Sequence, residues 1–284
     1  MIKIVTDSTA DIPDALAQEL GITVAPALLE IDGTTYLDGI TLTRDQFYRD
    51  LPTYRDFPKT AAAPVAAFSD LYRAAKQSGA DEIISIHLSN KFSGMVNSAR
   101  VAAGALGEEG QVENIQVHVV DSGSVSMGLG WQCVIAAQMA QHGANVSSIL
   151  QRLDDLAKRT VIYLLFDTLK YLRKGGRVSA LTAGVGDLMQ IKLLLEINQG
   201  NLNQLDRVRL RARGLDRLVE LATAHGKAER LSIAYTSSAT DKDLLALQER
   251  VTPLCAEPPT VYRVSPVLGA HYGPGGLGVI MVGI

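Results

Sequence analysis

The sequence predicts an α/β protein built from two domains. Short apolar runs of strand length alternate with longer stretches whose apolar residues recur at helical spacing. Through the first half of the chain this alternation is regular, which indicates a mainly parallel sheet with helices on its faces. After residue 160 two strand-like runs follow each other across a short turn, so antiparallel pairing is expected there. We therefore predict an N-terminal α/β domain over residues 1–157 and a mixed or antiparallel α/β domain over residues 158–284.

Turn and cap signals place the elements of the N-terminal domain. Asp32-Gly33 separates two short apolar runs and supplies the positive φ angles of a tight hairpin turn. Thr43 with Gln46 three residues later fits a capping box that opens a short helix. The predicted elements are the strand Ile2–Val5, a helix from Pro13 to Leu20, the hairpin over 28–36, a helix after Thr43, a helix from Pro64 to Gln77, the strand Glu82–Leu88, a helix from Gly94, the strand Ile115–Val120 and a helix from Gly128 to Gln141.

The C-terminal domain is predicted to begin with a strand, Thr160–Phe166, and a hairpin around Gln199-Gly200. Lys192–Asn198 and Asn201–Arg209 would be the two strands of that hairpin. Apolar residues recur at helical spacing after Gly214, which predicts a helix there. The remaining predicted strands are Leu231–Tyr235, Thr260–Val264 and Gly278–Val282.

The composition excludes several classes of protein. The chain has 284 residues, a formal charge of −3 and 47% hydrophobic residues, of which few are aromatic. Intrinsic disorder requires low hydrophobicity and high net charge, and nucleic-acid or anionic-membrane partners require a basic surface. No run approaches the ~18 apolar residues of a membrane span. Cys133 and Cys255 lack metal-ligand or redox-pair spacing, as is typical of buried thiols in a reducing compartment. We expect a cytoplasmic protein without a metal site, a nucleic-acid partner or stable membrane insertion.

Nucleotide-binding and phosphotransfer signatures are missing from the sequence. No glycine-rich loop with the P-loop or dinucleotide spacing follows a predicted strand. Asp7 ends the first strand, where catalytic carboxylates are sometimes found. A phosphatase of the haloacid-dehalogenase type would need a second aspartate at the position of Thr9. We therefore expect Asp7 to form hydrogen bonds in the turn with Ser8 and Thr9.

Ser93 lies between a predicted strand and a predicted helix, as a hydrolase nucleophile does. A nucleophile elbow requires glycine two residues earlier, where this chain has Lys91. A helix cap is the simplest role for Ser93, and the same geometry presents N–H donors to an anion. Thr60 is a comparable polar residue among small ones. An alternative is a serine hydrolase or a small-molecule phosphotransferase that uses Ser93 with His271.

Two further segments are candidates for binding. Arg207, Arg209, Arg211 and Arg213 alternate, so on a strand they would share one face, either as a solvated edge or as a docking surface for an acidic partner. The segment 269–276 is too glycine-rich for a helix or strand, which predicts a loop with His271 at its centre. Such a loop either lets the backbone approach a ligand closely or forms a tight structural turn.

Together these segments resemble the DegV family of bacterial fatty-acid-binding proteins, the FakB-like partners of fatty acid kinase. The resemblance spans essentially the whole chain. Its most specific part is the segment from Leu169 through Arg177 to Ser179. The other matching segments are Ile4–Pro13, Ser89–Ser98, Asp121-Ser122 with Met127-Gly128, and Gly269–Gly278.

The resemblance implies two α/β domains that enclose one long-chain fatty acid, such as palmitate, between them. In the family a threonine and a serine hold the acyl carboxylate, and they correspond to Thr60 and Ser93. Secondary candidates at the ligand are Ala61, Gly94, Ser122 and His271. This chain has Ala61-Ala62-Ala63 where the family often has Ser-Gln-Pro, so only the backbone of Ala61 remains to assist.

The resemblance also implies a partner and a role. The protein would have no catalytic residue or cofactor of its own, and it would present the bound carboxylate to a fatty acid kinase subunit for acyl-phosphate formation. Arg209 and His271 would lie where the kinase engages. A monomer is expected.

Overall fold

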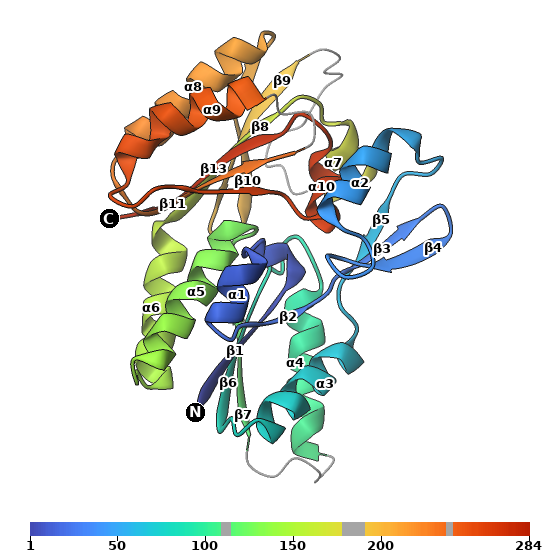
Figure 1. Cartoon of the computed structure of the whole chain (residues 1–284), viewed down its shortest axis with the longest axis vertical. Helices are drawn as coiled ribbons and strands as arrows, with labels where there is room; N and C mark the ends of the chain where they lie inside the picture. Colours follow the sequence, from blue (N-terminus) through green and yellow to red (C-terminus); the bar gives the residue numbers. More distant parts are fainter. Residues whose placement is uncertain (109–114, 178–190, 237–240) are drawn as a thin grey trace. The chain divides into compact units, whose positions relative to one another are not determined.

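The computed structural model describes residues 1–108, 115–177, 191–236 and 241–284, and it divides the chain into two compact units. The first unit comprises Met1–Leu28 with Ala61–Lys158, and the second comprises Leu29–Thr60 with Arg159–Ile284 (Figure 1). The main division lies beside the predicted boundary at 157/158. The segment Leu29–Thr60, which the sequence analysis placed in the N-terminal domain, groups with the second unit instead.

The first unit contains a four-stranded sheet among its described residues. Its order is β2-β1-β6-β7 and all neighbouring strands are parallel, as expected. Helices cover both faces, with α1, α5 and α6 on one and α3 and α4 on the other (Figure 1). The strands are β1 (Ile2–Asp7), β2 (Thr23–Ala25), β6 (Glu82–His87) and β7 (Gln116–Asp121); the helices are α1 (Asp14–Glu19), α3 (Val65–Gln77), α4 (Met95–Glu108), α5 (Met127–Gln141) and α6 (Val146–Arg159).

The helix α6 was not predicted, although its sequence carries the signal. Val146, Ile149, Leu153 and Leu156 are buried and recur at helical spacing. They form the apolar stripe of an otherwise polar helix, which is the pattern of a helix packed with one face on a core.

The segment Leu29–Thr60 carries β4 and most of a small sheet of order β4-β3-β5, which comprises β3 (Leu28–Ile31), β4 (Thr34–Leu37) and β5 (Lys59–Ala61). The predicted hairpin turn is present, with φ of 50° at Asp32 and 83° at Gly33. The helix α2 (Arg44–Asp50) begins with the predicted capping box of Thr43 and Gln46.

Contacts with the C-terminal residues explain why this segment groups with the second unit. Arg263 pairs with Asp45 at 2.5 Å between Nη1 and Oδ1. The amide of Val267 donates to the buried carboxylate of Asp38 at 3.3 Å. These contacts join residues more than 200 positions apart, so local sequence patterns do not reveal them.

The second unit contains a six-stranded mixed sheet in the described residues, of order β10-β9-β8-β13-β11-β12. Neighbouring strands of this sheet pair antiparallel except β11 and β12, which are parallel. This confirms the antiparallel pairing predicted after residue 160. The elements are β8 (Thr160–Phe166), α7 (Lys170–Lys174), β9 (Lys192–Asn198), β10 (Asn201–Val208), α8 (Arg211–His225), β11 (Ala228–Tyr235), α9 (Asp241–Val251), β12 (Thr260–Arg263), α10 (Pro266–Tyr272) and β13 (Leu277–Gly283). The core of this unit packs α8 and α9 against the sheet through residues such as Leu165, Leu194, Leu218, Leu247 and Val279.

The predicted loop over residues 269–276 is wrong in its first half. The helix α10 runs to Tyr272, and the loop begins only at Gly273, where φ is 70°. Pro266 favours the first turn of this helix. A Cβ at Gly269 would lie 2.5 Å from Tyr48 Oη, so glycine is there to let a helix pack closely.

The predicted single face of four arginines is also wrong. Arg207 lies on β10, Arg209 follows the strand in a bend, and Arg211 and Arg213 lie in the first turn of α8. Arg211 instead forms internal ion pairs, at 2.7 Å to Asp167 Oδ1 and 2.8 Å to Asp243 Oδ2. Val178 and Ser179 of the Leu169–Ser179 motif lie outside the described residues.

Candidate functional site

The carboxyl edge of the parallel sheet is the first candidate region. In the order β2-β1-β6-β7, the chain leaves β1 toward β2 and leaves β6 toward β7, so connections diverge between β1 and β6. Ligands of open α/β sheets bind outside the carboxyl ends of strands at such a switch point. Asp7 ends β1, and the segment 88–94, here named the serine loop, follows β6 and leads to Ser93.

The Asp7 carboxylate is buried and organises this edge. Its Oδ1 accepts from the amide of Thr9 at 3.1 Å and from the Thr9 hydroxyl. Its Oδ2 accepts from the amide of Leu88 at 3.2 Å and lies 2.9 Å from His87 Nδ1. The predicted turn bond to Thr9 is therefore confirmed, whereas Ser8 uses its hydroxyl to accept from the amide of Ala27 at 3.0 Å.

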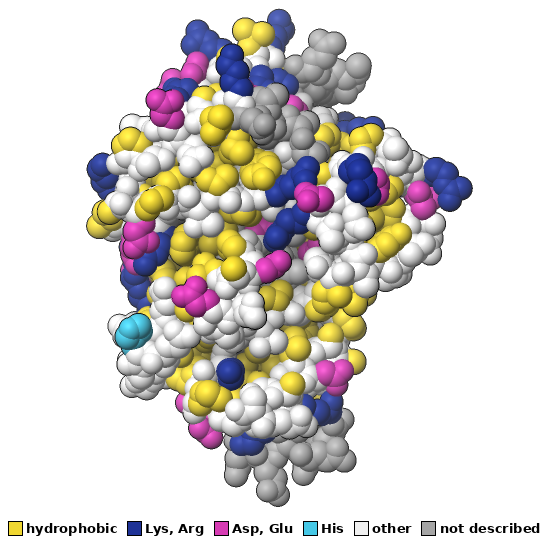
Figure 2. Space-filling model, in the orientation of Figure 1, with side chains coloured by type: hydrophobic (Ala, Val, Ile, Leu, Met, Phe, Trp, Pro, Cys, Tyr) yellow, Lys and Arg dark blue, Asp and Glu magenta, His cyan; other side chains and the backbone are white. Residues whose placement is uncertain are grey.

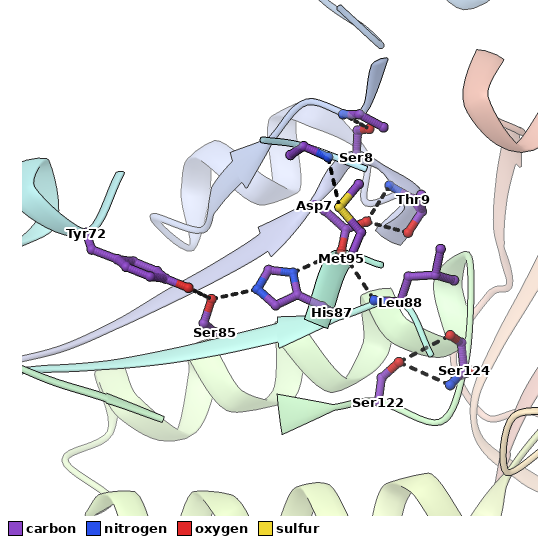
Figure 3. A network of polar contacts seen from close by, with 12 residues as sticks. Asp7, Ser8, Thr9, Tyr72, Ser85, His87, Leu88, Met95, Ser122 and Ser124 are labelled. Carbon is purple, nitrogen blue, oxygen red and sulfur yellow. Dashed lines mark hydrogen bonds and ion pairs between the residues drawn. The ribbon is translucent and has the colours of Figure 1, made fainter. Parts of the chain in front are cut away.

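Asp7 is one end of a buried chain of side chains, here named the relay (Figure 3). His87 Nε2 lies 2.6 Å from Ser85 Oγ, and Ser85 Oγ lies 2.7 Å from the Tyr72 hydroxyl. The order of Ser85, His87 and Asp7 is that of a catalytic triad. All of these residues are 0% exposed, so no substrate reaches Ser85. The relay is a structural feature of the first unit.

The serine loop is tied to its neighbours by backbone bonds. The amide of Ser89 donates to Ser124 O at 3.0 Å, and the amide of Asn90 donates to Asp121 Oδ2 at 3.3 Å. Ser93 is half-buried and Gly94 is exposed, directly before α4 begins at Met95. The predicted position of Ser93 between a strand and a helix is thus confirmed.

Ser122 lies on the same edge, after β7, but its hydroxyl is already engaged. The side chain is fully buried, and its Oγ donates to Ser124 O at 3.2 Å and accepts from the amide of Ser124 at 3.1 Å. The side-chain amide of Gln132 donates to Ser122 O at 2.9 Å. Ser122 therefore shapes the loop after β7 through contacts within that loop and with α5.

In the second unit the structure brings Thr60 and His271 together. Thr60 Oγ1 lies 2.9 Å from His271 Nε2, across 211 positions of sequence. His271 lies in the last turn of α10, and a Cβ at Gly175 would lie 2.1 Å from its Nδ1. Burial, followed by the charge of Arg177, lowers the pKa of His271 to about 4. The imidazole is therefore neutral at pH 7.

The hydrogen-bond partners of this neutral ring favour one of its two tautomers. Nδ1 is buried and has no hydrogen-bond partner among the described residues. An unpaired acceptor at Nδ1 costs less than an unpaired donor, and Nε2–H can donate to Thr60 Oγ1. In this tautomer the Thr60 hydroxyl accepts from His271, so its own proton can be donated to a further acceptor such as a ligand oxygen. Arg177 Nη1 donates to Gly175 O at 2.7 Å, which holds a positive charge near the pair.

The other predicted residues lie at the surface. Ala61 is exposed and follows Thr60 directly, as the first residue of the returning part of the first unit. Arg209 is exposed and lines an open hollow of about 420 Å³ on the second unit, whose other lining residues include Leu210, Arg213 and Arg217. Arg217 pairs with Glu220 and Asp206, whereas Arg209 and Arg213 form no ion pair with any described residue. Basic and acidic side chains are otherwise interspersed on the face drawn in Figure 2.

Neither the relay nor a role for Arg177 was predicted from the sequence. Ser85 and His87 stand two positions apart on one strand, so their side chains point to the same face, and that spacing was a usable signal. Tyr72 comes from α3, and no local pattern brings it to Ser85.

Neither cysteine is arranged with other side chains to bind a metal ion in the described residues. Burial raises the pKa of the Cys133 thiol to about 12, and Cys255 is half-buried. No cluster of three or more His, Cys, Asp or Glu side chains in the described ranges is arranged to hold a metal ion. None of the helices in those ranges combines the length and apolar character that a membrane span requires.

Comparisons with known proteins agree with this architecture. The model of the DegV family, described as uncharacterised proteins, matches residues 1–283. A DegV domain-containing protein of Streptomyces coelicolor is 34% identical over 284 residues, covering 99% of this chain and 98% of that protein.

Solved structures with the same fold include proteins described as binding fatty acids. A DegV family protein of Thermus thermophilus, described by its fatty acid binding, is 27% identical with a TM-score of 0.86, over 100% of this chain and 99% of the other. A stearic-acid-binding protein of Eubacterium ventriosum is 25% identical with a TM-score of 0.86, over 99% and 98%. Both match this chain from end to end.

Proposed function

We propose that this chain, which belongs to the DegV family, binds one long-chain fatty acid and has no catalytic residue of its own. Whole-chain similarity to fatty-acid-binding structures supports the ligand class. The observation that carries the proposal for the site is the Thr60–His271 pair: with its proton on Nε2, His271 donates to Thr60 Oγ1, and the Thr60 hydroxyl can then donate to a carboxylate.

In this proposal Thr60 and Ser93 hold the acyl carboxylate. A carboxylate that leaves water must receive hydrogen bonds, or its pKa rises until it becomes neutral. Hydroxyl donors satisfy it without a full counter-charge. The exposed Gly94 supplies a backbone amide before α4, and Ala61 can contribute only its backbone. Ser122 would act by shaping its loop, since its hydroxyl is already engaged.

The acyl tail would provide most of the affinity. Each buried methylene contributes about 0.8 kcal/mol, so about 14 of them give on the order of 11 kcal/mol before entropic costs. The hydroxyl groups would then set the orientation of the ligand, and palmitate is a suitable test ligand.

We further propose that the bound carboxylate is presented to a fatty acid kinase subunit. A carboxylate oxygen would attack the γ-phosphorus of ATP bound by that partner, the bond to ADP would break, and an acyl phosphate would form. Arg209 supports a docking role because it is exposed and unpaired within the described residues, beside Leu210, which is 67% exposed. His271 would couple the bound head group to the kinase. A cytoplasmic monomer fits this role.

The ligand proposal is tested by native mass spectrometry of protein purified from bacteria and then incubated with palmitate. We expect one bound acyl chain per protein. Thr60→Val should weaken palmitate binding about tenfold, whereas Thr60→Ser should retain it, because only the second keeps the hydroxyl. Ser93→Ala and Ser93→Thr form the same pair for the other residue. A protein that carries no lipid and takes none up would refute the proposal.

The alternative, an enzyme using Ser93 and His271, has less support. His271 Nε2 is already bonded to Thr60, and its Nδ1 packs against Gly175. Labelling of Ser93 by a fluorophosphonate probe would nevertheless establish a hydrolase in place of a carrier.

A further inference from the structure

The relay links the helix α3 to the switch point of the parallel sheet. Tyr72 on α3, Ser85 and His87 on β6, and Asp7 on β1 form one continuous chain of hydrogen bonds (Figure 3). All four side chains are 0% exposed. A buried polar chain of this length is costly unless every member is satisfied, so the direction of its protons can be derived.

The two ends of the relay set that direction. An ionised Asp7 only accepts hydrogen bonds, so His87 Nδ1 must carry a proton. Within the described residues the Tyr72 hydroxyl has no partner except Ser85 Oγ. Burial raises the pKa of Tyr72 to about 12, so its phenol keeps its proton and donates to Ser85. Ser85 must then donate to His87 Nε2.

The opposite direction leaves a buried donor unpaired. A doubly protonated His87 would donate from Nε2 to Ser85, and Ser85 would donate to Tyr72. The Tyr72 proton would then have no acceptor in a site without solvent access, which costs the desolvation of that group. The inventory therefore favours a neutral His87 with its proton on Nδ1.

This tautomer has a consequence for the two loops at the switch point. With His87 as a donor, Asp7 receives four hydrogen bonds, two of them from the backbone amides of Thr9 and Leu88. These amides begin the loop after β1 and the serine loop after β6. Ser93 lies five residues beyond Leu88, and its amide donates to Ser89 O at 3.3 Å.

We propose that His87 is a positioning residue for ligand binding: through its Nδ1–H it holds Asp7 in the orientation that fixes the start of the serine loop, and thereby places Ser93. Phe68 packs edge-on against the ring of His87, with centroids 4.9 Å apart. The ring is therefore held by Phe68 and by its hydrogen bond to Asp7. The ligand part of this inference rests on the proposed function, because it concerns the serine that would meet the carboxylate.

Two substitutions of His87 separate positioning from general stability. In His87→Asn the side-chain amide reaches the place of Nδ1 and can still donate to Asp7. In His87→Gln the amide reaches the place of Nε2, so the bond to Asp7 is lost. Both variants remove the ring that packs on Phe68, and both are neutral amides, so each controls for the other. Their unfolding free energies, the palmitate affinity and hydrogen exchange in residues 86–94 are measured together.

We expect His87→Gln to weaken palmitate binding about tenfold and to speed amide exchange at Leu88 and Thr9, because Asp7 loses a donor. His87→Asn should remain within about threefold of the unmodified protein in affinity. In the unmodified protein, imidazole ¹⁵N NMR should show a protonated Nδ1 and an unprotonated Nε2 at His87.

Three results would overturn the inference. One is equal loss of affinity in both variants in proportion to their loss of stability. Another is unchanged affinity and exchange in both, and the third is a proton on His87 Nε2. If the unmodified protein binds no palmitate, the proposed function fails on its own. The difference in amide hydrogen exchange between His87→Gln and His87→Asn then still shows whether His87 positions the serine loop.

Discussion

His87 in the first unit and His271 in the second each contact a hydroxyl group, yet their surroundings differ. Both ring nitrogens of His87 have partners, Asp7 and Ser85, and the ring is 0% exposed. His271 has one partner, Thr60, and its Nδ1 is buried without one in the described residues. A fully paired histidine locks structure. A histidine with an incomplete set of partners leaves its neighbour, Thr60, able to donate to something else.

Substitution of Asp7, the partner of the fully paired His87, should reduce stability most. Asp7→Asn keeps the shape of the side chain but turns one acceptor into a donor facing the Leu88 amide and His87 Nδ1. We expect the free energy of unfolding to fall by about 3 kcal/mol in urea denaturation. Asp70→Asn, an exposed aspartate on α3, should leave it unchanged. Equal stability of the two variants would mean that the relay contributes nothing.

A glycine tests the packing of the second histidine. In Gly175→Ala the new Cβ would lie 2.1 Å from His271 Nδ1, so the ring must move away from Thr60. We expect a loss of about 2 kcal/mol of stability, measured by denaturation, together with weaker palmitate binding. Gly104→Ala is the control, because nothing lies within 4 Å of that Cβ on α4. Retained affinity in Gly175→Ala would remove His271 from the head-group site.

The pH dependence of stability tests the burial of His271. The folded-state pKa of His271 is about 4, below its ordinary value of 6.5, so the unfolded chain binds more protons between these values. The contribution is fully present above pH 6.5 and is lost as the pH falls toward 4. We expect His271→Gln to lose about 1–2 kcal/mol less than the unmodified protein between pH 7 and 4.5. Parallel pH profiles of the two proteins would contradict a buried neutral His271.

The smallest effect on the isolated protein is expected at the exposed arginine. Arg209 is exposed and forms no ion pair with a described residue, so the melting temperature and the palmitate affinity of Arg209→Ala should not change. Acyl-phosphate formation with a kinase partner should fall, because the docking charge is lost. The control is Lys158→Ala, which removes an exposed cation on α6. It should leave the palmitate affinity and acyl-phosphate formation unchanged. An equal loss of coupling in both variants would show that Arg209 has no special role.

Local sequence patterns predicted the elements better than their partners. The Asp32-Gly33 turn, the Thr43 capping box and the alternation of strands and helices are confirmed, because each depends on residues a few positions apart. The glycine content of the segment 269–276 predicts a loop, but α10 continues through His271, and the missing side chain of Gly269 allows close packing against Tyr48. From the sequence alone, a glycine that permits close helix packing cannot be distinguished from a glycine in a loop.

For the candidate site, individual residues were predictable from the sequence, whereas the contacts between distant residues were not. The family resemblance named Thr60, Ser93 and His271, and the positions of Ser93 between a strand and a helix and of Asp7 at the end of a strand were predictable. Residues 211 positions apart meet in the Thr60–His271 bond, and Tyr72 reaches Ser85 from a different element. Neither contact follows from spacing along the chain.

Local spacing and composition were enough to predict the fold class and the position of the serine loop after a buried strand, and matching motifs carried the resemblance to the family. The grouping of Leu29–Thr60 with the second unit and the buried relay that contains Asp7 and His87 became apparent from the three-dimensional structure. The structure also showed that Arg211 is an internal ion-pair partner, unlike Arg209. The physical reason is that burial and hydrogen-bond partners depend on residues brought together across the chain, which no local pattern specifies.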